Sequence, residues 1–308
     1  MVEPLPPSFI EYEPSNWFVA PRSLPAEPSL KDFRNIDFYR EYEEDPSTLN
    51  EYGQPLLKKL PNDFMKNYMS IIVNLNIKKE KFTDPEFPPE LSSLKGDGSK
   101  CPKDWISGQR TCTAWKRPTE FFGEGNFAVF KDKIEPADIK QGAIGNCYFM
   151  ASVAALSENP HRIYRLFISR DVSPYGCYCL NVCDGGRWKS VIIDDKVPCY
   201  EHDGSPAFAK GNGNEIWVML LEKVWARLYK GYCNIEGGWA REVLNELTGA
   251  PCTSYTPEYP HLFTKIEEAT KNKWVMTTAS ATGSGSHDEK TETGISHNHL
   301  YSLLGGYR

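Results

Sequence analysis

The spacing of hydrophobic residues predicts several helices along the chain. Apolar side chains fall close to one stripe of a helix between residues 63 and 77, and they recur at every fourth position between residues 215 and 229. The run from 147 to 159 is also helical in pattern. It stops before Pro160, because proline disfavours helical geometry in the residue that precedes it. A shorter helix is expected at 241–247, after two glycines.

Alternation of apolar and polar residues predicts strands elsewhere. Two short alternating segments, 178–182 and 188–193, are separated by a Gly-Gly pair, which is typical of a β-hairpin. Two further strands, 273–279 and 299–304, flank a polar loop rich in Gly, Ser and Thr. Because helices dominate the first part of this order and strands the second, the pattern predicts an α+β protein with two lobes.

The first 79 residues have a different pattern, which we interpret as an N-terminal extension. Seven prolines interrupt the first thirty positions and break any helical or strand periodicity. A stretch rich in acidic and aromatic residues follows, and its aromatic side chains argue against complete disorder. We therefore expect a Pro- and Tyr-rich extension over 1–79 and a folded body from residue 80 onward.

Composition narrows the class of protein. A chain of 308 residues is long enough for about two domains, and 40% hydrophobic and 25% charged residues are ordinary values for a soluble protein. Collagen-like, coiled-coil and wholly disordered classes are therefore excluded. The 35 basic and 41 acidic residues give a net charge of −6, which offers no general attraction to nucleic acid.

The sequence also predicts a cytoplasmic protein without a membrane span. Its start lacks the basic and apolar regions of a secretory signal, and the longest apolar run, 149–156, is too short to cross a bilayer. The nine cysteines are scattered over a chain of ordinary size, which favours reduced thiols over a disulfide framework. Cys101 and Cys112, among others, show no pairing pattern.

Cys147 is the candidate nucleophile. It stands where a loop with Gly142 and Gly145 leads into the helix predicted from 147 to 159, and the unpaired amides and dipole of a helix N-terminus stabilise a thiolate. Gln141 is a neutral amide donor that is suited to hold an oxyanion. A cysteine at a helix start is also commonly a small core residue, and on these residues alone both interpretations stay open.

A nucleophilic cysteine needs a base, and His299 is the best placed of the six histidines because it begins a predicted strand after a long loop. His297 and His299 are alternatively a metal-binding pair, or two histidines at the edge of a loop. A zinc site at Cys177, Cys179 and Cys183 is disfavoured, because the spacing lacks a CxxC knuckle and the alternation suits a strand. We expect neither zinc nor a nucleotide as a cofactor.

The segment QGAIGNCYFMASVAAL, which contains Cys147, resembles the active-site motif of the calpains, the intracellular calcium-activated cysteine proteases. Calpains have QGxxGDC followed by an aromatic residue and a helix of small residues. Other blocks match the family in the same order: KFTDPEFPPELSSL, AWKRPTEFF, GRWKSVIIDDKVP, NEIWVMLLEKVWARLYKGY, EGGW and HNHLYSLLG. The resemblance covers residues 80 to 308.

The resemblance implies a papain-like cysteine protease core with two lobes. A helical first lobe, 80–238, would carry Cys147 as the nucleophile, and a β-rich second lobe, 239–308, would carry His299 as general base and acid. Gln141 would be the oxyanion donor. Proteins would be the substrates, and their amide bonds would be hydrolysed through an acyl-thioenzyme. Two glycines would receive the substrate backbone: Gly237 and Gly238.

The resemblance further implies Ca²⁺ as a cofactor. In this family each lobe binds calcium, and binding rotates the lobes so that the cysteine meets the histidine. The carboxylates that match the first lobe's site are Asp138 and Glu215, together with backbone carbonyls of the stretch from Lys131 to Lys133. Hard oxygen ligands of this kind suit calcium. The sequence identifies no regulatory domain or subunit as a partner.

The chain departs from the family pattern near both candidate catalytic residues. Asn146 replaces the Asp that usually precedes the nucleophile, and Asn298 replaces the Gly that precedes the histidine. A calpain triad also contains an Asn downstream of the histidine, and none of the nine residues after His299 is an Asn. We therefore expect a catalytic region truncated before the triad Asn, with an incomplete second lobe. The chain is then a calcium-dependent cysteine endopeptidase, or alternatively a truncated or inactive calpain-like protein that acts as a calcium-responsive binding or regulatory module.

Overall fold

The structure, a computed structural model, describes residues 62–98, 101, 102, 105, 111–131, 133–280 and 294–307. Helices and strands are mixed along this part of the chain, which forms three two-stranded antiparallel sheets. None of the helices in these ranges has the length and apolar character that a bilayer crossing requires.

The longest strands, β2 (Cys177–Asp184) and β3 (Arg187–Asp194), form an antiparallel hairpin. Its turn consists of Gly185 and Gly186, whose φ angles are 58° and 76°. Two-residue hairpin turns favour positive φ at both positions, and glycine adopts it without strain. The hairpin expected from the alternating segments is therefore confirmed, and its strands are longer than the pattern predicted.

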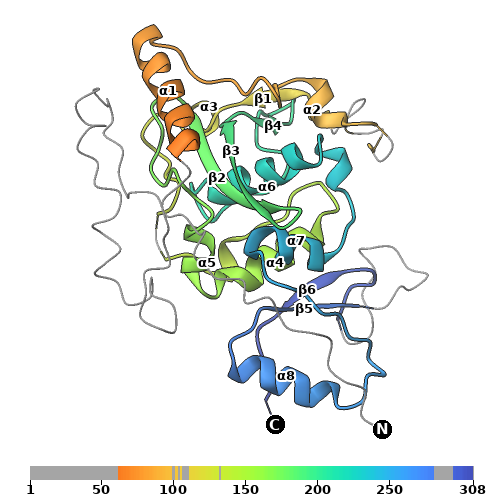
Figure 1. Cartoon of the computed structure of the whole chain (residues 1–308). Coiled ribbons are helices and arrows are strands. Elements are labelled where there is room, and N and C mark those ends of the chain that lie inside the picture. The colour runs from red at the N-terminus through yellow and green to blue at the C-terminus, as the bar shows by residue number, and fades with distance from the viewer. Residues whose placement is uncertain are drawn as a thin grey trace.

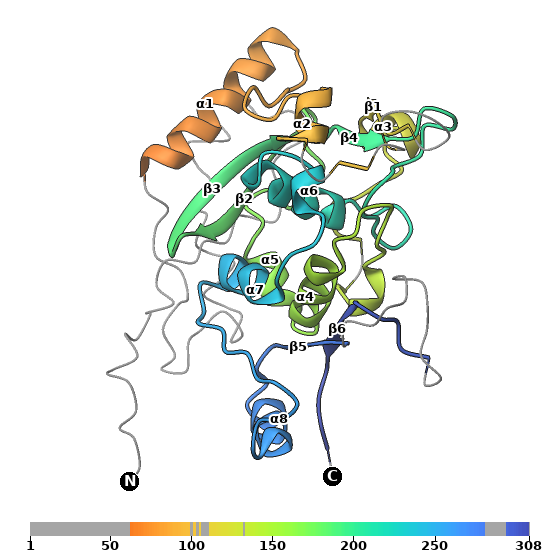
Figure 2. The ribbon, with the colours of Figure 1, turned by 90° about the vertical axis from the view of Figure 1, so that its right-hand side faces the viewer.

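Alternate residues of β2 face two different layers, because successive side chains of a strand point to opposite faces. The even-numbered residues contribute to the main hydrophobic core, whereas Cys177 and Cys179 lie in a second cluster beneath helix α1 (Asn62–Lys78). Figures 1 and 2 show α1 lying along the outer side of the hairpin. Three residues of α1 make its buried face: Tyr68, Ile72 and Leu75.

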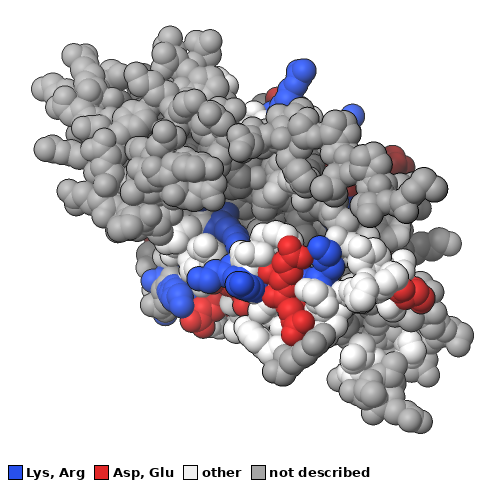
Figure 3. Space-filling model, turned by 60° about the horizontal axis from the view of Figure 1, so that its bottom comes forward, with Lys and Arg blue, Asp and Glu red and all other residues white. Residues whose placement is uncertain are grey.

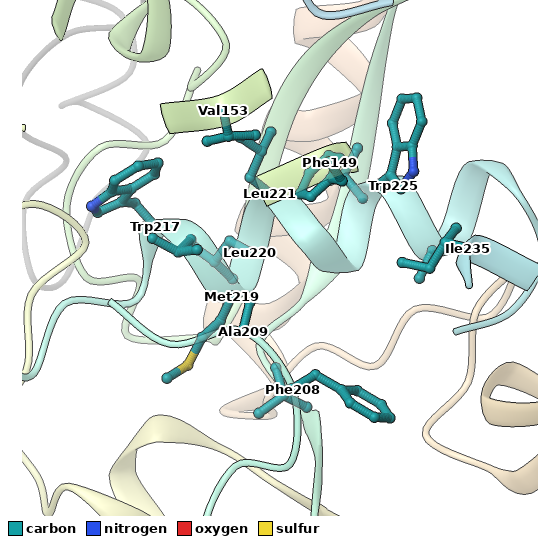
Figure 4. Close-up of a cluster of buried hydrophobic side chains, with 14 of the residues drawn as sticks. Phe149, Val153, Phe208, Ala209, Trp217, Met219, Leu220, Leu221, Trp225 and Ile235 are labelled. Atoms are coloured by element: carbon teal, nitrogen blue, oxygen red, sulfur yellow. The ribbon is translucent and has the colours of Figure 1, made fainter. Parts of the chain in front are cut away.

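The main core lies between the hairpin and two helices, α4 (Cys147–Ser157) and α6 (Trp217–Leu228). The rings of Phe149 and Trp225 join these helices, with 5.3 Å between their centroids. Figure 4 shows Val153 of α4 beside Leu221 of α6 in the same cluster. Both helices are confirmed, although α6 begins at Trp217, so Glu215 lies just before the helix and not inside it.

Shorter elements complete the main body: α2 (Leu91–Lys95), β1 (Ala114–Lys116), α3 (Pro118–Phe121), η5 (Pro136–Asp138), α5 (Pro160–Tyr164), β4 (Val197–Cys199), η6 (Cys233–Ile235) and α7 (Ala240–Thr248). Strands β1 and β4 pair with each other. Of these elements only α7 was predicted, because the others span five residues or fewer and show no readable hydrophobic period.

The last described segment consists of α8 (Leu262–Lys271), β5 (Met276–Ala279) and β6 (Leu300–Leu303). The two strands pair antiparallel, which confirms the strands expected here, and they lie between α4 and α8 (Figures 1 and 2). Leu300 packs against the main core. The small sheet therefore rests directly on the helix that begins at Cys147.

Helix α8 was not predicted, and it exposes polar side chains together with Phe263, which is 40% exposed. Seen from the side of the molecule where α8 lies, the described surface carries basic and acidic side chains close to one another (Figure 3). On α8 itself, Lys265 and Glu268 form an ion pair of 2.9 Å. Charges of both signs are therefore mixed on this face.

The order of elements differs from the expected helix-rich first part and strand-rich second part. The longest strands, β2 and β3, lie in the first lobe as the sequence divides it, and two helices, α7 and α8, lie after residue 239. The helix expected over 63–77 is confirmed as α1. Our expectations for residues 1–61, and for residues 281–293 of the polar loop expected over 281–296, lie outside the described residues.

The cysteines were expected to be reduced thiols and not to form a disulfide framework, and one pair departs from this expectation. Cys101 and Cys233 form a disulfide, with Cα atoms 4.7 Å apart and 132 positions of sequence between them. Sequence spacing carries no signal for such a distant pair, because folding alone brings the two segments together. The other seven cysteines are free thiols, and five of them are buried: Cys112, Cys177, Cys179, Cys183 and Cys199.

Candidate active site

Cys147 is the first residue of α4 and is partly exposed, whereas the residues that follow it in the helix are largely buried. Asn146 is the N-cap residue, but its side chain makes no capping hydrogen bond to the helix. Cys147 therefore lies at the positive end of the helix dipole. The helix start that the sequence predicts at Cys147 is confirmed.

The loop before Cys147 is held by the segment 207–210. The N–H of Ala143 donates to the carbonyl of Ala207 at 2.9 Å, and Lys140 and Lys210 exchange two backbone hydrogen bonds of 3.0 Å each. A Cβ atom at Gly142 would lie 2.3 Å from the backbone of Phe208, so only glycine fits there. This loop is therefore fixed by backbone contacts.

Gln141 lies on the same loop and is exposed. Its Nε2 donates to the carbonyl oxygen of Ile144 at 2.8 Å. A side-chain amide has two N–H hydrogens, so this contact leaves one hydrogen for an oxyanion. The structure therefore brings the predicted donor onto the loop that leads to Cys147.

Gly237 and Gly238 lie against the residues that flank the nucleophile. The N–H of Gly237 donates to the carbonyl of Gly145 at 2.9 Å, and Gly237 has a φ of 67°. A Cβ atom at Gly238 would lie 2.6 Å from the ring of Tyr148. Both glycines are exposed, so this edge of the site leaves room for another backbone.

His299 immediately precedes β6, the strand that rests on α4. Its backbone is fixed by Ser280, which donates its N–H to the His299 carbonyl at 2.9 Å and accepts the His299 N–H at Oγ at 3.0 Å. The imidazole meets the ring of Tyr301 edge to face, with 4.8 Å between centroids. The elements that carry the predicted nucleophile and base are therefore in contact.

Asn298, where the calpain pattern has Gly, has a φ of 50°. This left-handed conformation suits glycine, and asparagine is among the few other residues that adopt it readily. The replacement is therefore compatible with the backbone at this position. His297, the other half of the alternative metal pair, is not joined by a third ligand, since the described residues contain no group of three His, Cys, Asp or Glu side chains able to hold a metal ion.

Two buried carboxylates lie at the predicted calcium site. Asp138, in η5, accepts the N–H of Glu135 at 2.8 Å, and Glu215 accepts the N–H of Lys131 at 2.7 Å. The stretch from Lys131 to Lys133 is thus tied to Glu215 at Lys131, and Asp138 follows it five residues after Lys133. Lys133 is exposed, so its backbone lies near the surface. Two carboxylates and the carbonyls of this stretch are hard oxygen donors that fit calcium.

The sequence did not single out Glu222 of α6. Its side chain is buried, and burial raises its pKa from 4.5 to about 7. One carboxyl oxygen accepts the Asn146 side-chain N–H at 2.8 Å, and the other accepts the backbone N–H of Ala209 at 3.0 Å. The available signal was a glutamate that directly follows six apolar residues of the predicted helix, IWVMLLE.

Comparison with known proteins gives one family. A family model described as "Calpain family cysteine protease" matches residues 82–307. A calpain-type cysteine protease of rice (Oryza sativa subsp. japonica) is 31% identical over 240 residues, 73% of this chain and 11% of the rice protein. A calpain of Schistosoma mansoni is 28% identical over 272 residues, 85% of this chain and 34% of that protein. Human calpain-12 is 28% identical over 233 residues and is covered for 31% of its length. The chain therefore spans about a third or less of these relatives.

Proposed function

Because this chain belongs to the calpain family of cysteine proteases, we propose that it holds the reacting groups of an intracellular, calcium-dependent cysteine endopeptidase. The observation that carries the proposal is the placement of Cys147 at the start of α4, with the strand that follows His299 resting on the same helix. A thiol at a helix N-terminus and an imidazole on an adjoining element are the two groups that acyl transfer needs.

The proposed reaction hydrolyses a peptide bond in two stages. The thiolate of Cys147 attacks the carbonyl carbon, and protonated His299 gives its proton to the leaving amine, which leaves an acyl-thioenzyme. In the second stage His299 takes a proton from water, and the resulting hydroxide attacks the thioester and releases the carboxylic acid and the Cys147 thiolate. His299 keeps this proton, so the thiolate and the imidazolium of the first stage are restored. The side-chain N–H of Gln141 would stabilise the oxyanion in both stages.

The proposed substrates are proteins that bind in an extended conformation. Gly237 and Gly238 are exposed next to Gly145 and Tyr148, so a substrate backbone would approach there without meeting a side chain. We also propose that the body has the two-lobe, papain-like arrangement, with 80–238 and 239–308 on either side of this cleft.

We propose calcium as the regulatory ion of the first lobe. Asp138 and Glu215 would hold it, with backbone carbonyls of the stretch from Lys131 to Lys133. The ion would supply positive charge that draws both carboxylates onto this stretch, which precedes the loop of Gln141. The chain's own residues perform every chemical step.

The first test is Cys147→Ser, which replaces the thiolate by a weakly nucleophilic hydroxyl. We expect calcium-stimulated cleavage of a protein substrate such as casein to fall at least about 10³-fold. Cys252→Ser, at an exposed thiol elsewhere, is the matched control and is expected to cleave like the original chain. Cleavage that Cys147→Ser leaves unchanged would refute the assignment.

A second measurement separates the two candidate roles. A peptide-like alkylating probe is added with and without millimolar calcium, and the labelled cysteine is located by mass spectrometry. Selective, calcium-dependent labelling of Cys147 supports the protease. A calcium-dependent change of structure without labelling of Cys147 would instead favour a calcium-responsive binding or regulatory module.

A further inference from the structure

Glu222 is a buried titratable group that takes part in no step of the proposed reaction. It lies on α6, behind the chain that leads into Cys147, and is 2% exposed. The next residue of the helix, Lys223, is turned away from it and pairs with Asp194 at 2.7 Å. The neighbours that satisfy Glu222 are therefore two N–H donors, not a cation. A carboxyl group in an apolar core without a cation is costly, which calls for an explanation.

The first donor connects Glu222 to the nucleophile. Asn146 is fully buried and directly precedes Cys147 in the chain. Asparagine is a preferred N-cap residue, yet this side chain turns into the core and donates through Nδ2 to Glu222 instead of capping α4. Its Oδ1 has no hydrogen-bond partner among the described residues. The contact to Glu222 thus fixes the orientation of the residue that sets where α4 begins.

The second donor connects Glu222 to the loop of Gln141. Glu222 accepts the N–H of Ala209, in the segment 207–210 that pairs with the loop before Cys147. One carboxyl group therefore contacts Asn146, which directly precedes Cys147, and Ala209, which lies in the segment that holds the loop of Gln141. In the proposed reaction the Cys147 thiol and the side-chain amide of Gln141 act on the same substrate carbonyl. A displacement of either donor would move one of these two groups relative to the other.

We propose that Glu222 is a positioning residue, which through Asn146 and Ala209 holds the Cys147 thiol and the Gln141 loop in register for acyl transfer. This inference rests on the proposed function. Glu222 touches neither substrate nor thiol, so it acts only through the two residues that it holds.

Asn146 can form a hydrogen bond with Glu222 whether the carboxyl group of Glu222 is charged or neutral. The carboxylate accepts the Nδ2 hydrogen, and the neutral acid donates to Oδ1 once the side-chain amide turns over, while Ala209 keeps donating to the other oxygen. An Asp at 146 lacks the N–H and would need a shared proton. The titratable group that faces Glu222 from another element is Tyr232, whose hydroxyl is buried and whose pKa is raised, first by burial and then by Glu222.

The experiment compares Glu222→Ala with Glu222→Gln. Alanine leaves the two buried donors without an acceptor, so we expect the alkylation rate of Cys147 and kcat to fall at least about tenfold, with KM nearly unchanged. Glutamine has the same shape: its oxygen accepts from Ala209 and its amide donates to Oδ1 of a turned Asn146. We expect this variant to stay within about twofold of the original chain at pH 8. Glu246→Ala, which removes a half-buried carboxylate bonded to Tyr229, is the matched control.

Each outcome decides the inference. If Glu222→Ala folds by circular dichroism and its Cys147 is alkylated at the original rate, the inference is overturned. If Glu222→Ala does not fold, Asn146→Ala decides, because it removes one contact and leaves Glu222 in place; an original rate in that variant also overturns the inference. Failure of the proposed function looks different: the original chain cleaves no protein substrate, while the alkylation rate of Cys147 still depends on Glu222.

Discussion

At the scale of single residues, Glu222 makes stability depend on pH. Its pKa is about 7 in the folded chain against an ordinary value of 4.5, and burial is the cause. The folded state therefore binds this proton more tightly than the unfolded state. The contribution to stability is complete below about pH 4.5 and is lost as the pH rises through about 7, a change of about 3 kcal/mol.

Replacing Glu222→Gln should remove this pH dependence. We expect the free energy of unfolding of the original chain to decrease between pH 5 and pH 7 more steeply than that of the variant, by about 2 kcal/mol over this range. Urea denaturation of both proteins at pH 5, 6, 7 and 8 measures this difference in the free energy of unfolding. Glu124→Gln, at an exposed loop position, should keep the original slope. Parallel curves for Glu222→Gln and the original chain would contradict the prediction.

The residues that could be found from sequence are those whose chemistry is local. Cys147 and Gln141 could be proposed as site residues because the loop, the helix start and the motif around them are contiguous in the chain, and Gly237 and Gly238 because of the family resemblance. Glu222 was missed because its role depends on donors 76 and 13 positions away. Burial of this kind is set by tertiary packing, which no local pattern reports.

At the scale of elements, α1 is held in position by its packing against the hairpin and Ser169. Tyr68 forms a hydrogen bond of 2.8 Å between its hydroxyl and Oγ of Ser169, and Ile72 is 2% exposed in the same cluster. We expect Ile72→Ala to lower the free energy of unfolding by about 2–4 kcal/mol, because it leaves a cavity between α1 and β2. Ile77→Ala is the control, since Ile77 is 71% exposed and should change stability by less than about 0.5 kcal/mol. Urea denaturation with a helix-sensitive probe distinguishes the two, and equal effects would show that α1 is not packed as described.

Long, periodic elements were predictable from the sequence and short ones were not. The stripes of α1 and α6 and the Gly-Gly turn of the hairpin are strong local signals, and the structure confirms them. The pair of β1 and β4 was missed, because each strand has three residues and its partner is more than eighty positions away. Helix α8 was missed although its length is ordinary, since its face is mostly polar and only Ala269 is buried.

At the scale of the whole molecule, one covalent link joins distant parts of the chain. The disulfide of Cys101 and Cys233 closes a loop that contains α4 and the hairpin, and Cys233 lies four residues before Gly237. We expect reduction, or Cys101→Ser, to lower the stability by about 2–5 kcal/mol, because the unfolded chain regains entropy. Thermal unfolding with and without dithiothreitol measures the effect, with Cys252→Ser as control. A melting temperature that does not respond to reductant would contradict the prediction.

The packing of α1 also has a consequence for the time course of synthesis. A ribosome produces α1 about a hundred residues before Ser169 and β2, against which the helix packs. At a synthesis rate of ~5–20 residues per second, roughly 5–20 s pass between the synthesis of α1 and that of the hairpin on which its apolar stripe packs. During that interval a nascent chain exposes the stripe to chaperones, and the helix completes its fold only when the hairpin has emerged.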